Sequence, residues 1–190
     1  MEVSTMIVIA VVVVVILYAI VIYNNLVSLK HAIGQAWSNI DVLLKQRHDE
    51  LPKLVETCKQ YMKHERETLE LVMKARSAVA SARQAHDVGG LGEAEGMLRL
   101  GLGNLFAVAE AYPDLKADEG FRHLRTRITG LENDIADRRE FYNASVNANN
   151  VRIEQFPDVI IARLLGFKAA KLLQFDAAEI SDVDLGAAFS

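Results

Sequence analysis

The sequence predicts an all-α protein in which one N-terminal transmembrane helix precedes a body of amphipathic helices. Two observations carry this prediction. An apolar run near the N-terminus has no charged residue, and the apolar residues after it recur every three or four positions. No stretch beyond the run alternates between apolar and polar residues with a period of two, so we expect no β-sheet.

The apolar run is dense from Met6 to Tyr23, inside an uncharged window from Val3 to Leu29. A membrane-spanning helix needs about 20 mostly apolar residues. A cleaved signal peptide would show a basic start, a shorter apolar core and a small-x-small cleavage site, but only Glu2 precedes this run. A half-exposed soluble helix would show polar positions. We therefore expect a retained membrane span, with membrane-spanning residues that include Met6, Val12, Ile16, Val21 and Tyr23.

The charges around the span predict its orientation. No Lys or Arg precedes it, whereas Lys30, Lys45 and Arg47 follow it. Basic residues are retained on the cytoplasmic side. The prediction is a single-pass protein of the cell (inner) membrane, with a short extracytoplasmic head at residues 1–5 and a cytoplasmic body.

Composition excludes several classes of function. The net charge of -4 argues against a general nucleic-acid binder, which would carry a basic surface. The single cysteine, Cys58, permits no internal disulfide and no cysteine-cluster metal site. Cys58 lies at an apolar helical position, which predicts a small core residue rather than a reactive thiol.

Three apolar stripes predict the amphipathic helices of the body. The first contains Leu26, Ile33, Trp37, Ile40, Leu44, Leu51, Leu54, Cys58, Tyr61, Val72, Ala75 and Val79. The second contains Leu91, Leu98, Leu102, Leu105, Ala109 and Tyr112. The third contains Phe121, Leu124, Ile128, Leu131, Ile135, Tyr142, Val146 and Ile153.

Turn chemistry predicts where these helices end. "HDVGGLG" (His86 to Gly92) supplies glycines for conformations with positive φ. "YPDLKADEG" (Tyr112 to Gly120) has a proline that ends one helix, and Asp114 or Asp118 to cap the next. "RHDELPK" (Arg47 to Lys53) is ambiguous. Either Asp49 caps a new helix with Pro52 in its first turn, or Pro52 kinks one long helix.

The last part of the chain is predicted to close the body and then lose order. "FPDVIIARLLGF" (Phe156 to Phe167) is typical of a short apolar helix. After Lys171 all charged residues are acidic. The predicted organisation is a head (1–5), a transmembrane helix (6–23), a helical domain (24–167) and an acidic, weakly ordered tail (168–190).

Several stretches resemble the LemA family of bacterial membrane proteins. The most specific is "AWSNIDVLLKQRHDELPKLVE", within Tyr23 to Glu65; "AEAYPDLKADEGF", "ENDIADRREFYNASVNANN" and "FPDVIIARLLGF" continue it. The resemblance implies an N-terminal membrane helix, an outside head and an antiparallel up-and-down four-helix bundle. It also favours a turn at Asp49. The family has no established biochemical activity, so the resemblance implies no reaction.

The sequence offers no catalytic, cofactor-binding or metal-binding residue. "HERE" (His64 to Glu67) lacks the second histidine of a zinc-protease helix. "GGLGEAEG" lacks the strand and the Lys-Ser/Thr pair of a phosphate loop, and is interpreted as a turn between helices. The Glu-x-x-His pairs of di-iron bundles do not occur. We expect no enzyme activity, no cofactor and no small-molecule substrate.

Four polar residues fall on or near the apolar stripes: Arg47, Glu65, Arg138 and Asn149. They are either exposed at the edges of the bundle, or form a candidate buried polar layer, with Arg138 paired to Glu65, that fixes register or partner choice.

An anchor, a bundle and no recognisable chemistry predict a membrane-anchored scaffold or adaptor. Its expected partners are the lipid bilayer, copies of itself as a homo-oligomer, and unknown membrane-associated proteins. One alternative is an accessory factor of a membrane protease or an envelope-stress system. A metal-binding helical bundle is the third hypothesis.

Overall fold

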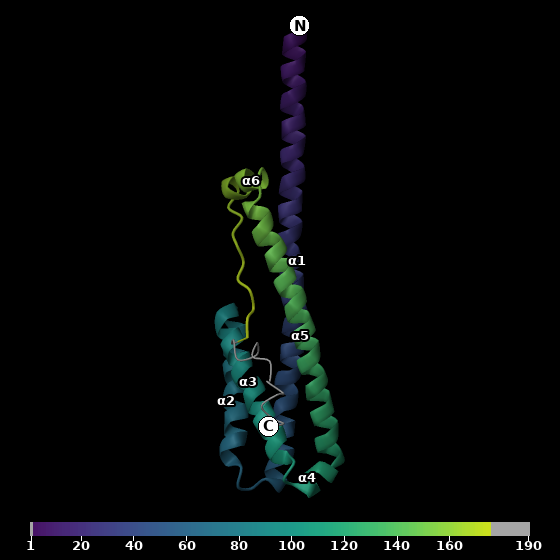
Figure 1. The fold of residues 1–190 in the computed structure, drawn as a ribbon, viewed down its shortest axis with the longest axis vertical. Coiled ribbons are helices and arrows are strands. Elements are labelled where there is room, and N and C mark those ends of the chain that lie inside the picture. Colours follow the sequence, from purple (N-terminus) through teal and green to yellow (C-terminus); the bar gives the residue numbers. More distant parts are fainter. Residues whose placement is uncertain (1, 176–190) are drawn as a thin grey trace, which may run out of the picture. The chain divides into compact units, whose positions relative to one another are not determined.

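The computed structural model describes residues 2–175, and within this range the chain is helical with no β-strand. Six helices follow one another (Figure 1). Their bounds are α1 Val3–Tyr61, α2 Arg66–Gln84, α3 Val88–Ala109, α4 Pro113–Ala117, α5 Glu119–Glu154 and α6 Asp158–Leu164. The all-α prediction is confirmed for this part of the chain.

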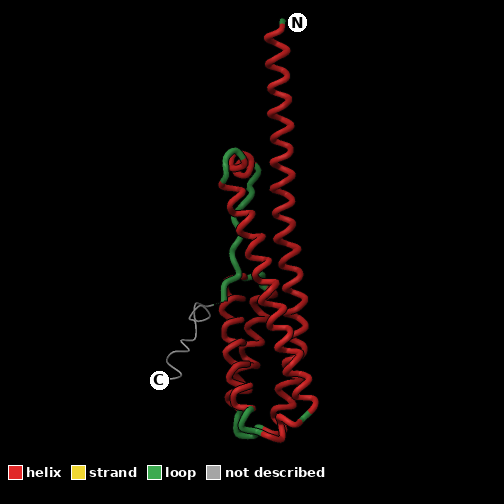
Figure 2. The backbone as a smooth tube through the Cα atoms, turned by 45° about the vertical axis from the view of Figure 1, so that its right-hand side comes forward, coloured by secondary structure: helices red, strands yellow, loops and turns green. Residues whose placement is uncertain are grey.

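The chain divides into two compact units, and α1 and α5 pass through both of them. The first unit comprises Met1–Asn39 and Glu140–Leu172; the second comprises Ile40–Arg139 and Leu173–Ser190. The prediction of an acidic, weakly ordered tail lies outside the described residues from position 176 onward. Residues 168–175 are described, and form a loop that is green in Figure 2.

In the second unit, helices α1, α2, α3 and α5 each bury an apolar stripe. Helices α2 and α3 lie side by side in both views (Figures 1 and 2). Representative core residues, all at most 4% exposed, are Leu44, Leu51, Leu54, Cys58, Leu69, Val72, Leu91, Leu98, Leu105, Phe121, Ile128 and Ile135. All of these except Leu69 belong to the predicted stripes, because side chains three and four positions apart share one helix face.

The first unit has its own smaller core at α6. Ile22 and Leu26 of α1 and Ala162 of α6 are buried together, with Ile153, Ile161 and Phe167 packed against them. Tyr23 meets Phe167 edge-to-face, with 6.1 Å between ring centroids. Trp37 meets Tyr142 of α5 in the same way, at 5.7 Å. The first set of contacts holds α6 and Phe167 against α1 directly beyond the long exposed stretch of α1, whereas the Trp37–Tyr142 contact joins α1 to α5.

The predicted turn at Asp49 is wrong, because α1 continues through Asp49 and Pro52 to Tyr61. The chain turns instead at residues 62–65, between α1 and α2. That segment has no Gly or Pro, and the buried Met62 accepts a backbone hydrogen bond from Glu65. The available signal was the interruption of the apolar stripe after Tyr61.

The second predicted break is displaced. Helix α2 ends at Gln84, and His86 is the residue with positive φ (53°), whereas Gly89, Gly90 and Gly92 lie inside α3. The third break is as expected. Pro113 begins α4, and the Oδ1 of Asp118 accepts a hydrogen bond of 2.7 Å from the backbone N–H of Phe121 in the first turn of α5.

Candidate functional site: an exposed apolar helix and a buried charge cluster

The first turns of α1 expose apolar side chains all round the helix. Its most apolar 18-residue window has a mean hydropathy of 3.3 and is 6% buried. Among the described residues, α1 alone is long and apolar enough to cross a membrane. Met6, Val12, Ile16 and Val21 are each at least half exposed. Because the exposure of so continuous an apolar surface to water is unfavourable, this stretch is a candidate membrane contact.

The end of the predicted span is refined by the structure. Ile22 is buried against α6, and Tyr23 packs on Phe167 while remaining 44% exposed. The exposed apolar stretch therefore ends at Val21. Tyr23 combines an apolar ring with a polar hydroxyl, as is typical of residues at the level of lipid headgroups.

In the second unit, three charged side chains from three helices meet around Arg47. Arg47 of α1 is 1% exposed, and its Nη2 donates a hydrogen bond to Oε1 of Glu95 on α3. Its Nη1 donates to Oε1 of Glu132 on α5 at 2.5 Å. The Nε of Arg47 is buried and has no partner among the described residues. One arginine thus joins α1, α3 and α5 at a single level.

Burial and charge act against each other in this cluster. The pKa of Glu95 is raised, because desolvation of the carboxylate outweighs its attraction to Arg47. Burial also disfavours the charged Arg47, but the two carboxylates more than offset this effect and raise its pKa. A charge this deeply buried stabilises the fold only while its partners are present. Loss of either partner would therefore leave an uncompensated buried charge between these helices.

The four polar residues singled out in the sequence do not form one layer. Arg47 is buried in the second unit, and Asn149 is buried in the first, where it donates to the carbonyl of Lys168 at 3.3 Å. Glu65 is half-buried and accepts a hydrogen bond of 3.3 Å from the hydroxyl of Tyr112. Arg138 is exposed, so it makes no buried pair with Glu65.

Sequence reasoning missed both true partners of Arg47. Glu95 lies within "GGLGEAEG", which was interpreted as a turn but forms the first half of α3. Its position, four residues after Leu91 and three before Leu98, places it on the buried stripe of that helix. That spacing was the signal that could have found it. Glu132 has the same spacing, four residues after the buried Ile128 and three before the buried Ile135, so the same signal was present.

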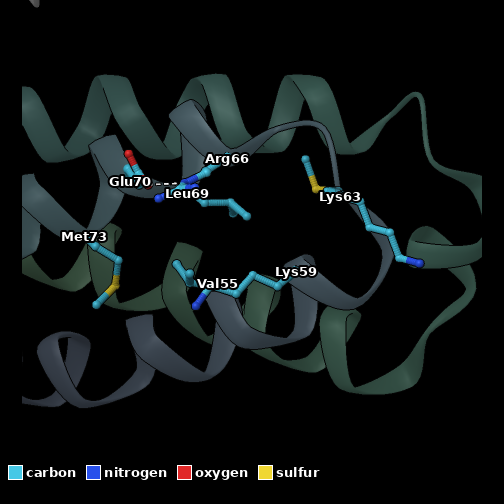
Figure 3. A pocket seen from close by; sticks show the side chains of 8 residues that line it. Val55, Lys59, Lys63, Arg66, Leu69, Glu70 and Met73 are labelled. Carbon is cyan, nitrogen blue, oxygen red and sulfur yellow. Dashed lines mark hydrogen bonds and ion pairs between the residues drawn. The ribbon is translucent and has the colours of Figure 1, made fainter.

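A groove opens in the second unit beside the turn from α1 to α2 (Figure 3). Its volume is about 500 Å³. Lys59, Lys63 and Arg66 form a basic rim, and Arg66 pairs with Glu70 at 2.6 Å. The remaining lining residues are apolar: Val55, Met62, Leu69 and Met73. The described side chains place no nucleophile or paired acid and base in this groove.

Within the described residues, no group of three or more His, Cys, Asp or Glu side chains is arranged to hold a metal ion. Burial raises the pKa of the Cys58 thiol to about 12, so the thiolate is strongly disfavoured at neutral pH. The thiol behaves as a core residue, as its position in the stripe predicts.

Fold and site together define the class: an all-helical protein with one helix suited to a membrane and a charge-paired helical body. The chain belongs to the LemA family, whose sequence model matches residues 36–185. The resemblance seen in the sequence is thereby confirmed.

Three proteins with sequences similar to this chain are all named as magnetosome protein MamQ. Two are "Magnetosome protein MamQ 1" and "MamQ 2" of Paramagnetospirillum magneticum, each 37% identical over 91 residues. The match covers 46% of this chain and 34% of each relative. The third, "Magnetosome protein MamQ" of Magnetospirillum gryphiswaldense, is 36% identical over 84 residues, or 42% of this chain and 31% of the relative. The matched segment thus spans about a third of these relatives.

Proposed function

We propose that this protein is a non-catalytic scaffold or adaptor of the inner membrane, anchored by α1 and acting through protein–protein contacts. The observation that carries the proposal is the exposed apolar stretch of α1, which continues as one helix into a charge-paired body. A helix that is apolar on all sides is suited to lipid, and the body it bears has helix faces to offer to partners.

The body in this proposal is an antiparallel up-and-down four-helix bundle made by α1, α2, α3 and α5. All four helices contribute buried residues to the core of the second unit. The connection from α1 to α2 is four residues long, and that from α2 to α3 is three. Short connections favour antiparallel neighbours, which supports this topology.

The proposed orientation places the body in the cytoplasm. Lys30 follows the exposed apolar stretch, and the segment from α6 onward adds Arg163, Lys168 and Lys171 in the same unit. Basic residues near the end of a span favour its cytoplasmic side. A protease added outside intact spheroplasts should leave the body uncut, whereas inverted vesicles should expose it. Cleavage from the outside would reverse the orientation.

Self-association is the proposed mode of action that the surface supports best. Leu71 of α2 and Met97 and Leu100 of α3 are each at least half exposed. They line a shallow cavity of about 210 Å³ on the α2–α3 face. Grouped exposed apolar residues are typical of interaction surfaces. We propose that this face binds a second copy of the chain or a membrane-associated protein.

The test is the mass of the full-length protein in detergent, by light scattering at several concentrations. We expect an oligomer that persists when residues 6–21 are replaced by leucine and dissociates with Leu100→Glu. Val42→Glu is the matched control, because Val42 is also apolar and more than half exposed, on α1. A strictly monomeric wild type would refute self-association and leave binding to other proteins as the scaffold's mode of action.

A further inference from the structure

Helix α6 presents a second exposed apolar surface in the unit that contains the proposed anchor. Phe156, Ile160 and Leu164 are 82%, 56% and 77% exposed. Ile160 and Leu164 are four residues apart and therefore lie along one side of α6, and Phe156 lies in the turn just before the helix. Leu165, which follows the helix, is 53% exposed. A helix this short and this apolar on its outer side is poorly suited to face water.

The opposite side of α6 is fixed to α1. Ala162 is buried with Ile22 and Leu26, and Phe167 packs edge-to-face on Tyr23. The apolar side chains of α6 and its flanks thus divide into an inner set that holds the helix in place and an outer set that is largely exposed. The inner set stabilises the packing of α6 on α1. The outer set makes no such contribution to the core, so its exposed apolar side chains need another explanation.

The length of the exposed part of α1 determines the level of α6 relative to a bilayer. From Val3 to Tyr23 an α-helix rises about 30 Å at 1.5 Å per residue, which equals the hydrocarbon thickness of a typical bilayer. If this stretch spans the membrane, Ile22 and Tyr23 lie at its boundary. Because α6 packs on Ile22, and Phe167 just after it packs on Tyr23, α6 lies at the same boundary.

The charges of this region suit an anionic surface. From Gln155 to Phe175 the single acidic residue is Asp158, which is buried and accepts a hydrogen bond of 2.7 Å from Arg152. Arg163 and Lys168 are exposed. A cavity of about 690 Å³ in this unit is lined by Lys30 and Lys168 together with the apolar Tyr23, Val27 and Phe167.

We propose that α6 is a second membrane contact. In it, Phe156, Ile160 and Leu164 enter the bilayer interface, and Lys30 and Lys168 bind the headgroups of anionic phospholipids. This inference rests on the proposed anchoring by α1. Apolar residues beside basic ones are the combination by which interfacial helices bind anionic membranes. The contact would hold the first unit at a fixed angle to the bilayer, which a single spanning helix alone does not do.

The depth of α6 is measured with nitroxide labels on cysteines introduced one at a time into the full-length protein in phospholipid nanodiscs. Labels at Phe156→Cys, Ile160→Cys and Leu164→Cys should collide with oxygen, which concentrates in lipid, and be protected severalfold from a water-soluble nickel chelate. Wild type provides the blank, because its only cysteine, Cys58, is buried.

Two controls distinguish a failure of the α6 contact from a failure of the proposed anchoring by α1. Ile16→Cys reports the span of α1, and Phe141→Cys reports an exposed aromatic position on α5 in the same unit. If Ile16 is in lipid but the α6 labels are as accessible to nickel as Phe141, the second contact is refuted. If Ile16 is itself exposed to nickel, the anchoring proposal fails.

The headgroup contact has its own measurement. A spin-labelled phosphatidylglycerol should associate with the wild type more strongly than the matching phosphatidylcholine. Each of Lys30→Gln and Lys168→Gln should reduce that preference about fivefold, the effect of one lysine at an anionic surface. Lys45→Gln is the control, since Lys45 is exposed in the second unit. If the wild type and the three variants all preferred phosphatidylglycerol to the same degree, Lys30 and Lys168 would not bind the headgroups. That result would overturn the headgroup part of the proposal.

Discussion

The Nε of Arg76 donates a hydrogen bond of 2.8 Å to the backbone carbonyl of His48. This carbonyl is the one that Pro52, four residues later, leaves without its helical partner, because proline has no N–H. The Nη2 of Arg76 also lies 2.7 Å from Nε2 of the His48 ring. A side chain of α2 thus supplies the hydrogen bond that the carbonyl of His48 loses to proline, and α1 continues through Pro52 instead of turning.

Arg76→Ala should therefore lower the free energy of unfolding by about 1–3 kcal/mol, since it leaves a half-buried carbonyl without a donor. In a Pro52→Ala background the new N–H at position 52 restores the helical bond, and the same substitution should cost less. Denaturant unfolding of the full-length protein in detergent gives both values. Arg66→Ala, which removes an exposed pair with Glu70, should change stability by less than about 0.5 kcal/mol. Equal costs of Arg76→Ala in the two backgrounds would disprove the relationship.

His48 should make stability depend on pH. Its pKa is lowered from the ordinary value of 6.5, first by burial and then by the charge of Arg76. The unfolded chain therefore takes up a proton at a higher pH than the folded protein does. The stability contribution is complete above pH 6.5 and is lost as pH falls through the depressed folded pKa. The difference in unfolding free energy between wild type and His48→Gln should shrink in that window. If the difference in unfolding free energy between the two proteins stayed the same from about pH 7.5 to about pH 5, the assignment to His48 would be contradicted.

Removing Arg47 should be among the most damaging single changes in the body. Arg47→Leu leaves Glu95 buried and unpaired, at a cost of about 3–5 kcal/mol. The double variant Arg47→Leu/Glu95→Leu should recover much of this loss, because no buried charge remains without a partner. Thermal unfolding followed by circular dichroism compares the variants. Arg138→Leu serves as the control and should change stability by less than about 0.5 kcal/mol, because Arg138 is exposed.

Position 92 requires glycine because the backbone of Gln174 passes directly against it. A Cβ at this position would collide with the backbone carbonyl of Gln174, next to the buried Leu173. Gly92→Ala should displace this segment, so that the amide hydrogens of residues 173–175 exchange faster with solvent. Gly103→Ala, on the same helix with open space around it, should instead stabilise α3 by up to about 1 kcal/mol. Unchanged exchange in Gly92→Ala would show that Gln174 has another position available.

The sequence by itself determined which residues are apolar and at what spacing, and these properties decide helix formation and burial. A continuous run from Met6 to Tyr23 predicted a membrane-spanning helix, which the structure leaves exposed as far as Val21, and the stripes predicted core residues such as Leu44 and Ile128. The cap at Asp118 was also predictable, because a capping side chain acts within a few residues of its own position.

Only the tertiary structure decided the features that depend on residues far apart in the chain. Pro52 has the same local chemistry in a turn and in a helix; the donor at Arg76, on another helix, makes the helix possible. Arg47 was visible as a polar residue on a stripe, but its partners Glu95 and Glu132 lie 48 and 85 residues away. The exposed side of α6 likewise became evident only once Ala162 and Phe167 had been placed on α1. Local patterns specify which face of a helix is buried, whereas packing alone specifies what that face meets.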